Sequence, residues 1–289
     1  MTADLRPRER RAPHAPPHDC TAAHDSLCVD LIRRHLWMET VGRRILLYGG
    51  VSSTNVVLRG LAARGAVEGT VVLAEEQVQG RGRRGRVWFS PPGLNLYVSV
   101  LFRPHIDLRE VPRFSFIASL ALTEAIWAEG LPAQIKWPND VLVDGRKVAG
   151  TLVDTADDAG GALRHVILGV GVNVNVDDEA LTIALRHESR EATSLRETAG
   201  REIDRNLFAA AFLNGLEKWF RTGRAREWDT LLTAWRERDG LRGHRVEIRG
   251  TGPAWQGRAM GVDAEGYLEV ESEDGARQRV ISGEIRLLD

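Results

Sequence analysis

Residues 80–86 combine three glycines and four arginines in the order Gly-Arg-Gly-Arg-Arg-Gly-Arg. Glycine lets the backbone approach a ligand closely, and the arginine guanidinium offers a planar fork of donors to carboxylate and phosphate oxygens. The letters also fit a G-x-G-x-x-G dinucleotide motif, but no helical periodicity follows Gly85, as that motif requires. The run is short, occurs once and precedes the aromatic pair Trp88-Phe89, unlike a disordered nucleic-acid tract. We expect a flexible anion-binding loop that acts as a lid.

Lysine is scarce, because only three of the 39 Lys and Arg residues are lysine, and two of these lie eleven residues apart. Lys136 opens the segment Lys-Trp-Pro-Asn-Asp, in which the proline fixes φ after an expected strand. Asn139 and Asp140 should therefore fall at a sharp turn, where both can reach a ligand or Mg²⁺. Lys147 opens the next expected strand, and Gly150 follows three residues later. A surface hairpin with a solvated lysine remains the alternative.

A third segment, residues 169–175, reads Gly-Val-Gly-Val-Asn-Val-Asn. An apolar strand ends here in Asn173 and Asn175, each of which carries hydrogen-bond donors and an acceptor on a short side chain. Such a pair can bind the edge of a base or close a turn, and the sequence leaves both readings open.

Strands and helices alternate around these segments before the pattern changes near the C-terminus. Apolar patterns predict strands over 70–74, 95–102, 135–143, 147–154 and 165–174, and helices over 27–38, after the cap at 52–55, and over 114–129, 205–222 and 225–238. Asp144-Gly145 indicates a hairpin. From residue 242 onward, short strands alternate with glycine-containing turns. We predict an α+β fold with a disordered tail over 1–24, a main domain over 25–238 and a small β-barrel over 240–289.

The composition excludes several classes of protein. The 289 residues are 43% hydrophobic and 27% charged, which is typical of a globular chain. A formal net charge of −1 excludes a histone-like or generic polyanion-coating protein. Two cysteines do not make a disulfide scaffold, and no apolar run approaches the roughly 20 residues that span a bilayer. The N-terminus has no apolar signal region, so we expect a cytoplasmic protein without membrane association.

Together these segments resemble the biotin protein ligases. The resemblance rests on Ser53-Thr54-Asn55, Glu76-Gln77-Val78-Gln79 with the glycine–arginine run, Trp88-Phe89-Ser90-Pro91, Lys136-Trp137-Pro138-Asn139-Asp140, Arg146-Lys147-Val148-Ala149-Gly150 and Gly169-Val170-Gly171-Val172-Asn173. Order and spacing are similar across roughly 48–175, and the small C-terminal barrel of the family is similar to 240–289. Too few residues precede this region for the helix-turn-helix of some bacterial members, so we expect the monofunctional type, without DNA binding.

The resemblance implies a fold and a reaction. The fold would be a mixed β-sheet catalytic domain of the class II aminoacyl-tRNA synthetase/biotin ligase type, with helices on one side, followed by an SH3-like β-barrel. In the reaction, the biotin carboxylate would attack the α-phosphate of Mg²⁺-bound ATP, giving biotinyl-5′-AMP and pyrophosphate. A lysine of a biotin carboxyl carrier domain, belonging to an acyl-CoA or pyruvate carboxylase, would then attack the mixed anhydride and release AMP. A homodimer is compatible with this resemblance, and the sequence does not name the acceptor.

The same resemblance assigns roles to residues. Biotin would be bound by Ser53, Thr54, Asn55, Gln77, Gly80, Arg81, Gly82, Arg83, Trp88, Lys147 and Gly150. ATP would be bound by Arg83, Trp88, Lys136, Asn139, Asp140 and Asn173, and Asp140 would also hold Mg²⁺. Lys147 and Arg83 would be catalytic, because a cation about 4 Å from a developing charge contributes about 4 kcal/mol at an effective dielectric constant of 20.

Two other functions stay open. A lipoate ligase of related fold would use the same adenylation chemistry, although Thr54, Gln77 and the complete glycine–arginine run favour biotin. A nucleic-acid-binding protein could use the arginine loop. The sequence also departs from the family in two places, since Ser52 replaces an acidic residue common in other members and 282–288 matches the last family motif only in part. We therefore assign no ATP contact to Arg286.

Overall fold

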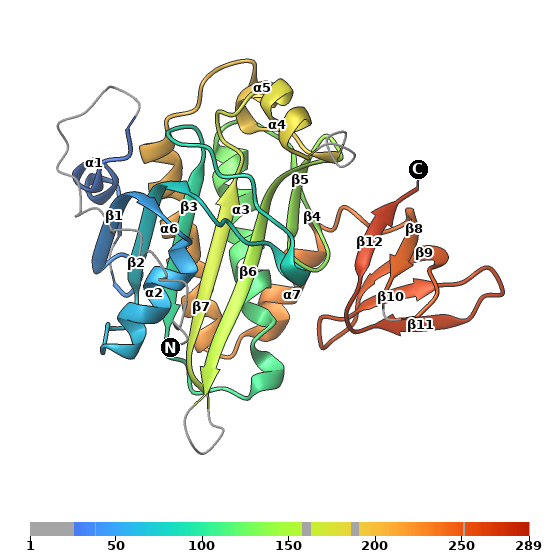
Figure 1. The fold of residues 1–289 in the computed structure, drawn as a ribbon. Coiled ribbons are helices and arrows are strands. Elements are labelled where there is room, and N and C mark those ends of the chain that lie inside the picture. Colours follow the sequence, from blue (N-terminus) through green and yellow to red (C-terminus); the bar gives the residue numbers. More distant parts are fainter. Residues whose placement is uncertain (1–25, 38, 158–162, 186–190, 251, 289) are drawn as a thin grey trace, which may run out of the picture.

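Two β-sheets form the framework of the computed structural model, which describes residues 26–37, 39–157, 163–185, 191–250 and 252–288 (Figure 1). The expected tail over 1–24 lies outside the described residues. The larger sheet has seven strands in the order β1-β2-β3-β7-β6-β5-β4. Their bounds are β1 Arg44–Val51, β2 Thr70–Gln77, β3 Leu96–Phe102, β4 Ala133–Lys136, β5 Asp140–Val143, β6 Arg146–Asp157 and β7 Leu163–Val172. Strands β1 and β2 pair in parallel, and the other neighbours pair antiparallel.

Helices cover both faces of this sheet unequally (Figure 1). On one face lie α3 Arg113–Ala128, α6 Arg205–Arg224 and α7 Trp228–Arg236. On the other face, α2 Thr54–Ala63 connects β1 to β2 and packs its Val57 and Leu58 against Val72 and Ile167 of the sheet. Shorter helices are α1 Val29–Arg34, α4 Asp178–Leu185 and α5 Leu195–Ala199, with 3₁₀ turns at Arg83–Gly85 and Leu108–Glu110.

Burial explains why the central elements form where they do. All seven residues of β3, Leu-Tyr-Val-Ser-Val-Leu-Phe, are buried, as expected for a strand covered on both faces. Helix α3 is apolar around most of its circumference because it lies between the sheet and α6. Gly215 allows the two helices to approach, since a Cβ there would lie 3.2 Å from Ala121 Cα. The side chain of Asp204 caps α6 by accepting from the backbone of Asn206 and Leu207.

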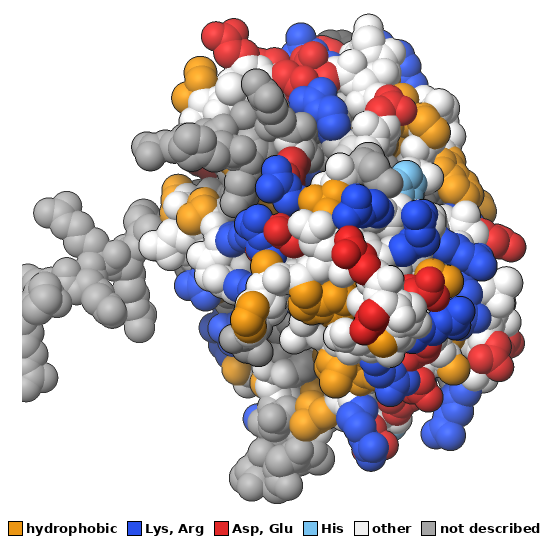
Figure 2. Space-filling view, turned by 90° about the vertical axis from the view of Figure 1, so that its right-hand side faces the viewer, with side chains coloured by type: hydrophobic (Ala, Val, Ile, Leu, Met, Phe, Trp, Pro, Cys, Tyr) orange, Lys and Arg blue, Asp and Glu red, His pale blue; other side chains and the backbone are white. Residues whose placement is uncertain are grey.

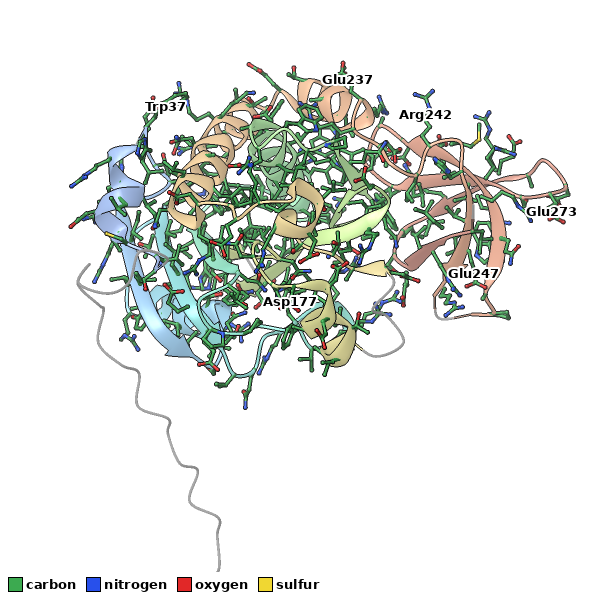
Figure 3. All side chains as sticks on the ribbon, turned by 90° about the horizontal axis from the view of Figure 1, so that it is seen from above. Trp37, Asp177, Glu237, Arg242, Glu247 and Glu273 are labelled. Carbon is green, nitrogen blue, oxygen red and sulfur yellow. The ribbon has the colours of Figure 1, made fainter. Side chains whose placement is uncertain are left out.

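The smaller sheet is antiparallel and contains five strands in the order β11-β10-β9-β8-β12. Their bounds are β8 Arg245–Arg249, β9 Trp255–Val262, β10 Leu268–Glu271, β11 Arg277–Val280 and β12 Glu284–Leu287. Its buried side chains join the core of the main sheet. Two tryptophans of the main body bind its backbone: Trp137 Nε1 donates to Gly266 O at 3.0 Å and Trp228 Nε1 to Ala264 O at 2.8 Å. The junction carries Arg242 and the nearby Glu237 (Figure 3).

The predicted α+β fold class is confirmed, but the helices are not all on one side of the sheet, because α2 covers the face opposite α3 and α6. The element boundaries also differ in informative places. Strand β1 was not among the predicted strands. The single strand expected over 135–143 is two strands, because a turn at 137–139 reverses the chain between β4 and β5. The hairpin at Asp144-Gly145 is present, with positive φ at both residues. Within the described ranges, every helix is too short or too polar to cross a membrane.

Candidate active site

A cavity of about 390 Å³ opens on the sheet face that carries α2. Strand alternation places Gly150 and Leu152 of β6, with Gly169 and Gly171 of β7, in its lining. The chain between β2 and β3, which contains the arginine loop, crosses over β7 and β6 toward β5 (Figure 1). The lining includes the predicted site residues Ser53, Thr54, Asn55, Gln77, Arg81, Gly82, Arg83, Trp88, Lys136, Asn139, Asp140, Lys147, Gly150 and Asn173. Among the predicted residues, only Gly80 is not in this lining.

The end of the cavity next to β1 and β2 is polar but uncharged. Ser53, Thr54 and Asn55 are buried at the start of α2. The backbone N–H of Thr54 donates to Gln77 Oε1 at 2.9 Å, and the Thr54 hydroxyl donates to the same oxygen at 3.1 Å. Gln77 Nε2 donates to Ser90 Oγ at 3.2 Å, whose hydroxyl donates to Trp88 O at 2.9 Å. These directed bonds fix the donors and acceptors before a ligand arrives, which suits a neutral ligand with both kinds of group.

Two glycines of β7 make room for the side chains of this pocket. A Cβ on Gly169 would lie 2.2 Å from Asn55 Oδ1, and one on Gly171 would lie 2.5 Å from Trp88 Nε1. Neither distance is compatible with a side chain, so glycine is required at both positions. In the sequence these glycines stand out only as part of a motif, and no role was predicted for them. The two glycines are two residues apart on one strand, which places both on the same face of the sheet. This spacing could have indicated that both face the pocket.

Lys147 lies where the neutral end meets the charged end. Its Nζ is 2.6 Å from Asp140 Oδ1 and 5.3 Å from the centre of the Trp88 ring. A Cβ on Gly150 would lie 3.3 Å from both Lys147 Nζ and Asp140 Oδ1, so glycine keeps the space beside the pair open. The alternative of a solvated lysine on a surface hairpin is therefore wrong. The ammonium faces the cavity and is free to share its three donors between Asp140 and a ligand.

The arginine loop is folded against the site rather than extended. Arg83 Nη1 donates to Asn139 Oδ1 at 3.0 Å, and Asn139 Nδ2 donates to Thr151 O at 2.8 Å, which links the loop to β6. Positive φ at Arg84 and Gly85 forms the tight turn. Burial lowers the pKa of Arg83 from its usual value, and the neighbouring charge of Arg84 lowers it further, while Asp140 raises it. The loop therefore carries a half-buried guanidinium into the cavity.

The C-terminal sheet contributes to the charged end. Arg86 pairs with Glu284, and this hydrogen bond is the main cause that lowers the pKa of the Glu284 carboxyl. Arg286 also lines the cavity, and its Nε lies 3.7 Å from Glu191 Oε1. Among the described residues, seven Lys and Arg side chains line the cavity against three Asp and Glu, although the whole chain is nearly neutral. This local excess of cations favours a polyanionic ligand.

Gly80 and Asn175 both contact other parts of the protein backbone or side chains. A Cβ on Gly80 would lie 2.4 Å from Trp88 O and 2.5 Å from Ser90 Oγ, so Gly80 allows the loop to pack without lining the cavity. Asn175 ties the segment after β7 to the segment before α6, because its side chain exchanges hydrogen bonds with the backbone of Ile203 at 2.9 and 3.0 Å. Asn173 lines the cavity, and its Nδ2 donates to Thr193 O at 3.0 Å.

Comparisons with known proteins agree with this geometry. Residues 50–173 match the Biotin/lipoate A/B protein ligase family, and residues 243–288 match the Biotin protein ligase C terminal domain. The chain is 33% identical over 257 residues to the Bifunctional ligase/repressor BirA of Bacillus subtilis, covering 89% of this chain and 78% of that protein. It is 32% identical to the Biotin–[acetyl-CoA-carboxylase] ligase of Mycobacterium tuberculosis, covering 89% and 96%.

A solved structure gives the same result for the fold. The biotin protein ligase from Aquifex aeolicus in complex with biotin and ATP superposes with a TM-score of 0.72 at 26% identity, covering 85% of this chain and 98% of that one. Sequence relatives above 30% identity, matched over most of their length, agree with this structural neighbour. The chain therefore belongs to the biotin protein ligases, within the biotin/lipoate A/B protein ligase family.

Proposed function

We propose that the cavity performs both steps of biotin–protein ligation, with ATP as the activating substrate and biotinyl-5′-AMP as the intermediate. One observation carries the assignment of residues: a neutral, hydrogen-bonded pocket joins a cation-rich end, and Lys147 lies where they meet. The ureido ring of biotin is uncharged and has both donors and an acceptor, so it suits the pocket around Thr54, Asn55 and Gln77. The valeryl carboxylate then extends toward Lys147.

In the first step, a carboxylate oxygen of biotin attacks the α-phosphorus of ATP and pyrophosphate leaves. Both reactants are anionic, so their approach is unfavourable without cations. Lys147 and Arg83 offset this repulsion and stabilise the charge that develops in the transition state. Lys136 and Arg86 lie at the same charged end and serve the triphosphate. Arg286, for which the sequence predicted no ATP contact, also lines this end and joins them. The indole of Trp88, fixed against Gly171, covers the reacting groups and reduces access by water.

Magnesium fits this site only together with the nucleotide. The described residues contain no cluster of three or more His, Cys, Asp and Glu side chains that would hold a metal alone. Mg²⁺ commonly binds through one or two carboxylates and the phosphates of its substrate, and Asp140 offers such a carboxylate beside Lys147. Asp140 would hold the ion, which when bound neutralises charge on the phosphate oxygens.

In the second step, the neutral amine of an acceptor lysine attacks the carbonyl carbon of the adenylate. The new amide bond forms, the bond from carbon to the phosphate oxygen breaks, AMP leaves with that oxygen, and the amine loses a proton. We propose a biotin carboxyl carrier domain of a carboxylase as the acceptor and, because the reaction consumes ATP, the cytoplasm as its location. The arginine loop protects the adenylate until the acceptor arrives.

Biotin-dependent exchange of labelled pyrophosphate into ATP tests the first step directly. We expect exchange with biotin and none with lipoate or octanoate. Transfer of biotin to a carboxyl carrier domain, detected by mass, tests the second step. Exchange that depends on lipoate would replace this function by the lipoate alternative. Salt-sensitive RNA binding without any exchange would support the nucleic-acid alternative, although cationic and anionic side chains are interspersed over the face that carries the C-terminal sheet (Figure 2).

A further inference from the structure

Both ends of the Asn55 side-chain amide are bonded to other protein groups at the floor of the neutral pocket. Its Nδ2 donates to Asp154 Oδ2 at 3.1 Å, and its Oδ1 accepts from Ser99 Oγ at 2.6 Å. An ionised carboxylate can only accept, so the amide cannot turn over without breaking its bond to Asp154. Asp154 therefore determines which end of the amide is the donor.

The surroundings hold this amide in place. Asn55 is only 5% exposed and Ser99 is fully buried. The backbone of Gly169 lies against the carbonyl end of the amide, where a Cβ would come within 2.2 Å. With one N–H used by Asp154 and one lone pair used by Ser99, the amide keeps one N–H and one lone pair, both with fixed directions.

Asp154 contacts Asn55 from outside the main cavity. It lies on β6 and lines a second hollow of about 350 Å³ together with Asn55, Arg59 and residues 81–85 of the arginine loop. Arg59 Nη2 donates to the same Oδ2 of Asp154 at 2.7 Å, from the outer side of α2. Asp154 therefore has two separable roles, one toward Asn55 and one toward Arg59.

We propose that Asp154 is a positioning residue that makes the pocket select a ureido ring, by fixing the donor and acceptor ends of Asn55. A ureido group carries a carbonyl and N–H groups on adjacent atoms, so it matches an edge with one donor and one acceptor. The dithiolane ring of lipoate has neither group and gains nothing from that edge. This inference rests on the proposed function. It assigns the selection of biotin over lipoate in part to Asp154, a residue that does not touch the ligand.

Four variants of the full chain test the proposal. Asp154→Leu removes the acceptor, Asp154→Asn keeps one acceptor oxygen, and Arg59→Ala removes only the outer contact of Asp154. Ser99→Ala releases the other end of the amide and also removes the hydroxyl that contacts Thr54 Oγ1 at 2.7 Å, so Asp154→Leu carries the test. In the exchange assay we expect Asp154→Leu and Ser99→Ala to raise KM for biotin about tenfold, as is typical for loss of a hydrogen bond to a charged or buried group. The kcat and the KM for ATP should stay within about twofold.

The controls separate positioning from general stability. Asp154→Asn should recover much of the KM, and Arg59→Ala should keep the parental KM. Desthiobiotin, which keeps the ureido ring and lacks the sulfur ring, should show the same KM ratio as biotin in every variant. A parental KM in Asp154→Leu, or an equal rise in Arg59→Ala, overturns the proposal, as does a parallel rise in KM for ATP. A parent chain without biotin-dependent exchange overturns the proposed function itself, which is a different result.

Discussion

Replacing Lys147 by alanine tests the electrostatic basis of the first step. Lys147 Nζ lies 2.6 Å from Asp140 Oδ1 and faces the cavity where carboxylate and phosphate must meet. The variant removes one cation from this place. It also leaves the Asp140 carboxylate without that partner, so a negative charge faces two anionic substrates. Both changes oppose adenylate formation.

The expected loss follows from the charge and its exposure. A unit charge about 4 Å from a developing charge contributes about 4 kcal/mol at an effective dielectric constant of 20. Because the Lys147 side chain is 31% exposed, solvent screening reduces this, and we take about 2–3 kcal/mol. At 1.36 kcal/mol for each tenfold change in rate, kcat/KM should fall roughly 30- to 150-fold. The repulsion from Asp140 adds to this value.

Biotin-dependent pyrophosphate exchange measures the effect, with Lys218→Ala as a matched control. Lys218 is also a lysine paired with a carboxylate, Glu124 at 2.8 Å, but it lies on α6, on the other face of the sheet. The control should retain parental exchange. Lys147→Arg keeps the charge with a different shape, and it should recover only part of the rate if a compact ammonium is needed. Exchange by Lys147→Ala within threefold of the parent would refute the electrostatic argument.

Three further variants have defined outcomes. Arg83→Ala breaks the bond to Asn139 and should release biotinyl-5′-AMP, seen as biotin on bystander lysines of added albumin; retention equal to the parent contradicts the lid. Gly171→Ala places a Cβ 2.5 Å from the indole of Trp88 and should raise KM for biotin with a loss of stability of about 1–3 kcal/mol; an unchanged KM and melting temperature would contradict this packing. Burial raises the pKa of Asp239 to about 6. The folded protein therefore loses stability as pH rises from about 4 to above 6, because the buried carboxyl must then carry a charge. Asp239→Asn should therefore be more stable than the parent above pH 7, by up to about 3 kcal/mol, with no gain at pH 4; a gain that does not depend on pH would exclude this cause.

Local patterns in the sequence pointed to residues that the structure brings together in one cavity. The glycine–arginine run, the two clustered lysines and the Asn-Asp turn all stand out from residue type and spacing, and their side chains line one cavity. These signals are local because each depends on residue type, on a turn, or on alternation along one strand. The sequence predicted a turn after Pro138 but not that this turn divides the strand expected over 135–143. Strand β1 was not predicted, because a short apolar run does not show whether other elements will cover it.

Contacts between distant segments could not be predicted in this way. Asn55 and Asp154 are 99 residues apart and meet because α2 packs over β2, β3 and β7, and Asp154 of β6 pairs with Ile167 of β7. Arg83 and Asn139 are 56 residues apart and meet because the loop crosses the sheet. The need for glycine at 169 and 171 is likewise decided by which side chains arrive from other elements.

By itself, the sequence determined the chemistry available to this protein: scarce lysines, a cationic loop and a set of neutral polar side chains, because residue type and spacing fix which groups exist. Only the tertiary structure decided how these groups act together. The order of strands in the sheet brings the neutral pocket and the cations to one cavity, places Asp154 behind Asn55, and adds Glu284 and Arg286 from the C-terminal sheet. The physical reason is that burial and close packing, which act between segments far apart in the chain, select one arrangement of those groups.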